Sequence, residues 1–333
     1  MPQHIRQPQM HQQQLPQQQL HRQALHSQHL DMLGHDQNGE LMDSPTTSTT
    51  TTTTTTTSST TPRKVAPRSS DLFRIGPHFT MTRHHQRIYC AGNDLEVNPI
   101  VTARIDRGFE MGDNGTWIGY KRNYFTLVSS FMFDNFNFDR FIHNKFYTIG
   151  EKGFRVDINY FAIRLVAKCS DDDVSISLIQ HTAKRDKGPQ FPPPIYPAVP
   201  GNLPDHETVK ASCNKRNNTK IDAMNKIFYF DRAQYYNEYN LNTMKDESCL
   251  RNYPSDSIAK VARFERIQFT SSIRIKSSNL NSRFFTLHVE LLGIIEDEQM
   301  GQIQPVLLSS VETPPLIIRG RSPSSYQKVG YRI

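Results

Sequence analysis

The sequence predicts an all-β sandwich, and three observations support this prediction. Beyond Pro62, aromatic and β-branched residues alternate with polar residues over many short runs. Turn-forming residues bound these runs, and helical signals are few and brief. Alternation with a period of two is typical of strands that bury one face, and many such strands with few helices indicate two sheets packed together.

The composition divides the chain at Pro62. Residues 1–43 are rich in Gln and His, and residues 46–61 are almost entirely Thr and Ser. Neither segment has enough large apolar side chains to offset the entropy lost on ordering. We therefore predict a disordered tail over residues 1–61 and a folded domain over residues 62–330. Gln-rich tails occur in transcriptional regulators and also arise as neutral low-complexity sequence, so the tail does not decide the function.

The alternation is clearest in the middle of the chain. Apolar side chains occupy every second position over 154–160, and the phase then shifts by one for 161–167. Such a shift predicts a bulge or a change of sheet. A further strand is predicted over 174–178, after a hairpin turn at Asp171–Asp173. Additional strands are predicted over 267–275, 285–291 and 316–318.

Two short helices and one proline-rich crossing complete the predicted elements. Ser255 or Asp256 could cap a helix that carries Ile258, Val261 and Ala262 on one face. A second helical turn is predicted over 139–144. Residues 189–204 contain seven prolines, which predict an extended, polyproline-like segment rather than a strand. This segment is either a ligand for SH3 or WW domains or a rigid loop that lies over the domain.

The positive charge belongs to the part that can fold. The formal net charge is +7, and the sequence pI is about 9.2. The first 61 residues hold two basic and four acidic side chains, so the other 272 hold 37 basic and 28 acidic ones. A basic domain suits a polyanionic partner such as nucleic acid, although charge also serves solubility alone.

Several classes of protein lack support in the sequence. It contains no nucleophile elbow, phosphate-binding loop, dinucleotide fingerprint or zinc-protease motif. The four cysteines and the scattered N-terminal histidines have no metal-site or disulfide spacing. No apolar run reaches the roughly 18–20 residues of a membrane span, and no signal-peptide core is present. We therefore expect an intracellular non-enzyme without cofactor, metal or membrane.

Six basic clusters carry the strongest functional signal, and several lie next to predicted strands. Long cationic side chains held at the rim of a rigid sheet can reach into a DNA groove, and the planar fork of arginine can bond guanine O6 and N7 together. Each cluster alone also fits an ordinary solvated loop. The clusters comprise Arg63, Lys64 and Arg68; Lys121 and Arg122; Lys184, Arg185 and Lys187; Lys210, Lys215, Arg216 and Lys220; Lys260, Arg263 and Arg266; and Arg319 and Arg321.

Around these clusters the chain resembles a known family over residues 63–330. The stretches TARIDRGFE, WIGYKRNYFTLVSSF, YFAIRLVAK, LIQHTAKRDKGPQF, SIAKVARFERIQFTSSI and TPPLIIRGRSPSSY are similar to the NDT/PhoG-like family of fungal transcription factors. The best-known member of that family activates middle-sporulation genes during yeast meiosis.

The resemblance implies a fold, a partner and a target. The fold would be an immunoglobulin-like β-sandwich in the style of p53 and Rel, with loops at one end that grip double-stranded DNA as a monomer. The target would combine a G·C-containing half with an A-rich tract, and arginines would read guanines at flexible pyrimidine–guanine steps. The protein would act in the nucleus as an RNA polymerase II activator, with transcription co-regulators as further partners.

The family's DNA-contacting positions can be transferred one by one. Arg122 and Arg185 would read guanines, supported by Lys121 and Tyr124. Lys64, Pro67 and Arg68 match the arm that follows the A-rich half. The remaining matched positions are Arg107, Lys210, Asn214, Arg216, Asn217 and Arg266.

Two departures from the best-known member affect the expected specificity. Lys210 stands where an arginine is usual, and Cys213 stands where serine is found. Lysine cannot make a bidentate contact, so base reading at this loop is in doubt. The chain also ends soon after TPPLIIRGRSPSSY, where that member continues into an activation region, which leaves open whether the Gln/Thr tail supports activation.

Two hypotheses of different classes follow. The first is a sequence-specific nuclear regulator in a developmental programme (meiosis, sporulation or morphogenesis) or in a stress or drug response. The second is a β-sandwich scaffold that binds partner proteins through the proline-rich residues 189–204.

Overall fold

A computed structural model describes most of the chain beyond the predicted tail. The described residues are 73–135, 137–150, 153–170, 173–182, 188–212, 218–239, 248–270, 284–297 and 302–320. All of them belong to one compact unit. The domain boundary expected at residue 62 lies outside them and stays a prediction.

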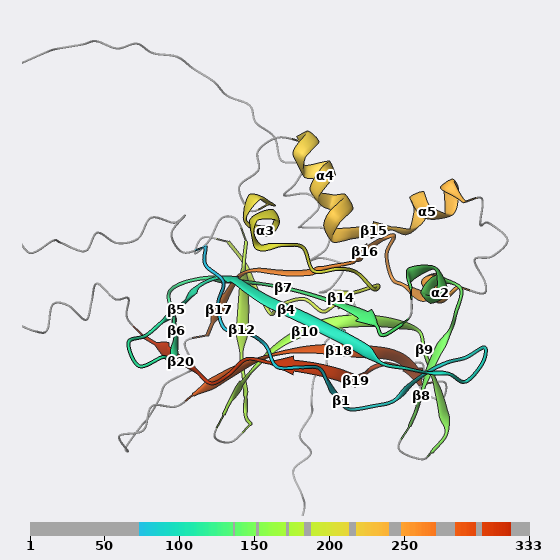
Figure 1. Ribbon diagram of the computed structural model, residues 1–333, viewed down its shortest axis with the longest axis horizontal. Coiled ribbons are helices and arrows are strands. Elements are labelled where there is room, and N and C mark those ends of the chain that lie inside the picture. Colours follow the sequence, from blue (N-terminus) through green and yellow to red (C-terminus); the bar gives the residue numbers. More distant parts are fainter. Residues whose placement is uncertain are drawn as a thin grey trace, which may run out of the picture. The chain divides into compact units, whose positions relative to one another are not determined.

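A five-stranded sheet forms one layer of the fold (Figure 1). All neighbouring strands in it are antiparallel. In spatial order its strands are β13 (Gln190–Phe191), β12 (Leu178–His181), β17 (Ala262–Phe269), β7 (Phe125–Phe133) and β4 (Pro99–Arg107).

A larger sheet forms the opposite layer, and β10 extends it by pairing with β18 over ten residue pairs. Its main path runs through β1 (Arg83–His84), β19 (Gln302–Glu312), β18 (Phe285–Asp297), β20 (Leu316–Arg319), β6 (Trp117–Tyr120) and β5 (Phe109–Met111). Off this path lie β10 (Tyr160–Cys169), β11 (Ser175–Ile176) and β14 (Tyr196–Pro197).

Smaller elements flank the two layers. A four-stranded sheet contains β3 (Glu96–Val97), β2 (Ile88–Cys90), β8 (Phe146–Ile149) and β9 (Arg155–Ile158), and a ribbon joins β15 (Tyr229–Asp231) to β16 (Ser257–Ala259). The helices are α2 (Phe138–Ile142), α3 (His206–Ser212), α4 (Asn218–Phe228), α5 (Arg232–Glu238) and the 3-10 helix η4 (Cys249–Asn252). No helix in the described part of the chain is long and apolar enough to cross a membrane.

The core lies between the two main sheets, as the alternating pattern requires. Leu127 and Phe131 of β7, Phe264 of β17 and Leu287 of β18 are all fully buried in one cluster. Phe131 also meets Phe161 of β10 across the layers, with 5.6 Å between ring centroids. Burial of one face from each sheet is the arrangement of a sandwich, and the prediction of an all-β, immunoglobulin-like fold is confirmed.

Two helices cover part of the outer face of the five-stranded sheet. Val128 of β7 points away from the main core and is buried with Val209 of α3 and Phe228 of α4. Val261, which immediately precedes β17, belongs to the same cluster. Figure 1 shows α3 and α4 over this layer. The helices therefore rest on a second, smaller apolar cluster.

The phase shift near residue 160 marks a change of sheet, which is one of the two predicted alternatives. Strand β9 pairs with β8 in the small sheet, whereas β10 pairs with β18 in the large one. Asn159 lies between them and donates its backbone N–H to the carbonyl of Ile294 at 2.8 Å. The strand predicted over 174–178 is also divided, because β11 pairs with β10 and β12 pairs with β17.

The remaining predicted strands are found, with different lengths. Strand β18 is longer than the predicted 285–291, and β20 contains all of 316–318. Strand β17 begins before residue 267, and residues 271–275 lie outside the described ones. The helical turn expected over 139–144 corresponds to α2.

The helix predicted after residue 255 is wrong. Residues Ser257–Ala259 form β16, and Ile258 pairs with Phe230 of β15. Ile258 and Val261 are buried in two different clusters, so they do not share one helical face. Branched side chains favour a strand when a partner strand is available, and that partner lies 28 residues earlier in the sequence.

The proline-rich segment is integrated into the fold. It contains β13 and β14, so the expectation of no strand within 189–204 is wrong for four residues. Tyr196, Ala198 and Val199 are buried in the main core. The hydroxyl of Tyr196 donates to the carbonyl of Arg263 at 2.8 Å. These contacts make the segment a packed crossing between the sheets.

Candidate DNA interface

Basic residues of β4, β17 and the β6–β7 turn lie at one end of the sandwich. Ile267 of β17 pairs with Gln180 at the end of β12 and with Phe125 at the start of β7. On the other side of β7, Arg107 at the end of β4 pairs with Thr126. This level of the sheet, which we call the rim, therefore lies beside the β6–β7 turn, where Lys121 and Arg122 are found.

Two β-bulges flank Thr126, and they explain why charged side chains occur in buried strands. In β4, Ile105 pairs with Leu127 and Arg107 pairs with Thr126, so Asp106 is an extra residue. Because paired positions alternate between the two faces of a sheet, the extra residue reverses the alternation and turns Arg107 to the outer face. In a regular strand, in which Asp106 paired with Thr126, Arg107 would instead share the core face of Ile105.

The second bulge lies in β17 and exposes Arg266. Phe264 and Ile267 both point into the core, with Glu265 and Arg266 between them opposite Thr126. Arg266 has φ of 53°, in the left-handed region that branched and long side chains rarely occupy. Its side chain is exposed, and no described residue bonds to its guanidinium. A strained residue next to a bulge is a common feature of functional sites.

The β6–β7 turn presents Arg122 to solvent. The N–H of Asn123 donates to the carbonyl of Tyr120 at 2.8 Å, which closes the turn, and Arg122 is exposed at its tip. The N–H of Lys121 donates to the carbonyl of Arg319 at 2.9 Å, where β20 runs parallel to β6. The structure thus places exposed Arg319, a member of the sixth basic cluster, beside the turn. Arg319 is not among the DNA-contacting positions that the family resemblance implies.

Beneath this turn, Tyr120 stays uncharged. Its hydroxyl donates to Glu110 Oε1 at 2.5 Å. Burial, and then the neighbouring Glu110 carboxylate, raise the pKa of Tyr120 to about 12. The turn is therefore supported by a neutral phenol at any physiological pH.

Tyr124 rests on a polar layer that the sequence did not reveal. Its ring lies 4.9 Å from the ring of His181 at the end of β12. His181 is buried, and its Nε2 lies 2.7 Å from Gln268 Oε1 of β17. Gln180 Nε2 donates to the carbonyl of Glu265 at 3.2 Å. These contacts join the residue before β7 to β12 and β17 at the rim. No local sequence pattern marks them, because the partners lie far apart in the sequence.

Arg107 is held against the first described residue of the chain. Its guanidinium carbon lies 5.0 Å from the centroid of the Phe73 ring. Gly108, the next residue, has φ of 110°, and a Cβ there would come within 2.5 Å of Phe125. Only glycine therefore allows β4 to turn away from the rim at this point.

Lys210 lies on α3, apart from the strands. Its Nζ is 3.4 Å from Glu207 Oε1, one helical turn earlier. This pair is exposed and contributes little to stability. Lys210 thus stays accessible on the helix that covers the rim end of the sheet (Figure 1).

Not every cationic residue of the clusters reaches the rim as a free side chain. Arg263 forms an ion pair with Glu265 and stacks over Phe228, with 4.7 Å from its guanidinium carbon to the ring centroid. Lys260 Nζ donates to the carbonyl of Lys226, and burial lowers the pKa of Lys260. Of the fifth cluster, only Arg266 projects outward at the rim.

The other predicted contacts lie outside the described residues, so their positions stay predictions. These are Lys64, Pro67, Arg68, Arg185, Asn214, Arg216 and Asn217.

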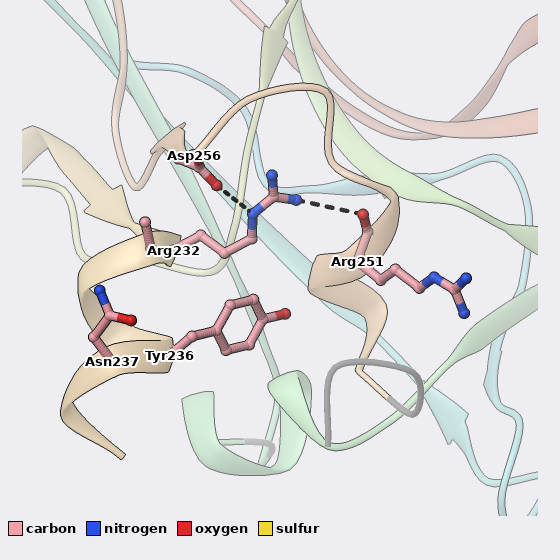
Figure 2. Close-up of a pocket in the computed structure, with 6 residues that line it drawn as sticks. Arg232, Tyr236, Asn237, Arg251 and Asp256 are labelled. Atoms are coloured by element: carbon pink, nitrogen blue, oxygen red, sulfur yellow. Dashed lines mark hydrogen bonds and ion pairs between the residues drawn. The ribbon is translucent and has the colours of Figure 1, made fainter. Parts of the chain in front are cut away.

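A surface depression elsewhere in the fold has a different character (Figure 2). It has a volume of about 360 Å³ and is lined by α5, η4 and Asp256. The guanidinium of Arg232 donates to the carbonyls of Leu250 at 2.7 Å and Tyr253 at 2.9 Å, and to Asp256 Oδ1 at 2.9 Å. These bonds tie η4 to α5, so this arginine supports the fold. Among the described residues, no group of histidine, cysteine or acidic side chains could hold a metal ion.

Comparisons with known proteins agree with this geometry. Residues 116–329 match the model of the NDT80 / PhoG like DNA-binding family. The chain is 65% identical over 304 residues to "Transcription factor NDT80" of Candida albicans, which covers 80% of this chain and 60% of that protein. It is 41% identical over 283 residues to "Meiosis-specific transcription factor NDT80" of Saccharomyces cerevisiae, which covers 79% of this chain and 44% of that protein. The chain thus spans about half the length of these curated relatives. With a family match over more than half of its residues, the chain belongs to the NDT80/PhoG-like DNA-binding family.

Proposed function

We propose that this protein is a sequence-specific DNA-binding transcription factor. The observation that carries the proposal is the convergence of Arg107, Arg122 and Arg266 at one end of the sandwich. They come from three chain segments, and each lies beside a turn or a bulge that directs it outward. Rigid presentation of arginine forks suits the reading of guanine edges in the major groove.

The target and the setting follow from the family. We propose a monomeric complex with double-stranded DNA that carries a G·C-containing half and an A-rich tract, like a middle-sporulation element. The protein would act in the nucleus as an RNA polymerase II activator with co-regulators. One relative is described as meiosis-specific, which supports a developmental programme. The proposed function does not include an enzymatic activity.

The scaffold alternative receives no support from the described structure. Tyr196, Ala198, Val199 and Pro200 of the proline-rich segment are buried. An SH3 or WW domain needs an exposed proline face, and this segment uses its central side chains for the core.

The test is a titration of the full chain against two labelled duplexes at one salt concentration. One duplex carries the G·C half and the A-rich tract, and the other has the same bases in scrambled order. Specific recognition predicts binding about 10³-fold tighter or more for the first duplex. Equal affinity for both would contradict the proposal, since phosphate contacts alone do not distinguish them.

A further inference from the structure

Asp106 is a fully buried carboxylate next to the rim. Its exposed fraction is 0%. Arg104 Nε donates to Asp106 Oδ1 at 2.6 Å, and Arg104 Nη2 donates to Oδ2 at 3.2 Å. His206 Nδ1 also lies 2.6 Å from Oδ1. Because a carboxylate oxygen accepts hydrogen bonds, we assign His206 Nδ1 as the donor in this contact.

The three residues join two separate elements. Asp106 is the extra residue of the β4 bulge, and it lies on the outer face together with Arg104. His206 is the first residue of α3, which begins about a hundred residues later in the chain. The bulge thus has a second effect, because the residue that turns Arg107 outward also binds the start of α3.

Lys210 is the fourth residue after His206, so both lie on the same side of α3. A helix of seven residues is too short to hold its own place. Within the described part of the chain, its attachment includes Val209 in the small apolar cluster and the bond from His206 to Asp106. The burial of Val209 holds α3 against the sheet. The hydrogen bond between His206 and Asp106 is directional, so it sets the rotation of α3 over β4.

We propose that Asp106 and His206 form a positioning latch for DNA binding, which orients α3 so that Lys210 faces the phosphates beside the rim. Neither latch residue touches DNA. Their effect on affinity comes from preorganisation, because a helix that is already oriented loses less entropy when DNA binds. This inference rests on the proposed DNA-binding function and adds a positioning role to it.

The experiment compares His206→Ala with His288→Ala in the full chain. His288 offers a matched control, since its Nδ1 lies 3.2 Å from Glu312 Oε2 on the opposite sheet. We expect His206→Ala to weaken binding to the specific duplex by about two- to tenfold, the factor associated with one lost hydrogen bond. His288→Ala should leave binding unchanged. His206→Asn keeps an N–H donor near the position of Nδ1 and should recover most of the affinity.

A double-mutant cycle separates positioning from general destabilisation. If the latch acts through Lys210, His206→Ala should have a much smaller effect in a Lys210→Ala background. Additive effects, or a fall in melting temperature with unchanged affinity of the folded protein, would overturn the latch. If the unmodified chain does not distinguish the specific from the scrambled duplex, the proposed function fails first, and the latch fails with it.

Discussion

Arg266 at the rim and Arg232 beside the depression are both arginines, but they differ in burial, in hydrogen-bond partners and in backbone conformation. Arg232 is largely covered, and it donates to the backbone carbonyls of Leu250 and Tyr253 and to the carboxylate of Asp256. Arg266 is exposed, lies in a strained backbone conformation and has no described partner. The fold therefore uses one arginine to hold itself together and exposes the other to solvent. Charge and residue type do not distinguish the two roles, whereas hydrogen-bond partners and backbone conformation do.

The largest effect is expected at the structural arginine. Arg232→Ala leaves buried carbonyls of η4 without donors, which should lower the free energy of unfolding by about 2–4 kcal/mol. Chemical denaturation measures this loss. The ratio of affinities for the specific and scrambled duplexes should stay the same in the folded fraction, and a changed ratio would remove the contrast between the two regions.

At the rim, Arg122→Ala should lower the affinity for the specific duplex and leave the stability of the fold unchanged. Loss of a bidentate guanine contact should cost about 1–3 kcal/mol on the specific duplex, with a much smaller change on scrambled DNA and no loss of stability. Arg185→Ala should behave in the same way. Arg155→Ala is a suitable control, because Arg155 is an arginine of the small sheet whose side chain is 46% exposed. Equal losses on both duplexes would assign Arg122 a phosphate role instead.

Arg266 allows stability and binding to be separated at one position. Arg266→Gly relieves the left-handed backbone and should raise the free energy of unfolding by about 1 kcal/mol relative to Arg266→Ala. Both variants should lose affinity for the specific duplex. Differential scanning calorimetry and anisotropy titration on the same samples provide the two readouts. A glycine variant no more stable than the alanine variant would show that φ of 53° is not a strain in solution.

The smallest effect is expected from the N-terminal arm. Lys64→Ala should weaken binding with little change in sequence preference, and it should flatten the plot of log affinity against log salt by about 0.9. A series of titrations between low and physiological salt measures the slope. If the slope is unchanged, Lys64 does not neutralise a phosphate.

Much of the fold followed from the sequence, because period-two alternation reports directly which face of a strand is buried. The phase shift at residues 160–161 predicted a bulge or a change of sheet, and a change of sheet between β9 and β10 is found there. The helix predicted near Ile258 failed for a non-local reason, since its partner strand Tyr229–Asp231 is distant in sequence. Short elements such as β13 and β14 were missed because two-residue pairings leave no periodic signal.

The candidate site was predicted only in part. Sequence and family resemblance selected Arg107, Arg122 and Arg266, and the structure brings these three to one end of the sheet. The pattern of Phe264 and Ile267 facing inward around two charged residues was a local sign of the bulge. No such sign existed for His181 beside Tyr124, because the two residues lie 57 positions apart in the sequence.

The sequence by itself determined the class of the fold and the excess of basic residues beyond Pro62, since these depend on local periodicity and on composition. The division of the chain at residue 62 stays a prediction. Only the tertiary structure decided which cations serve the fold and which face outward. Strand pairing and register set that choice. A one-residue bulge moves a side chain from the core to the surface. Whether a residue of a distant strand or helix then forms a hydrogen bond with that side chain decides whether it supports the fold or faces solvent.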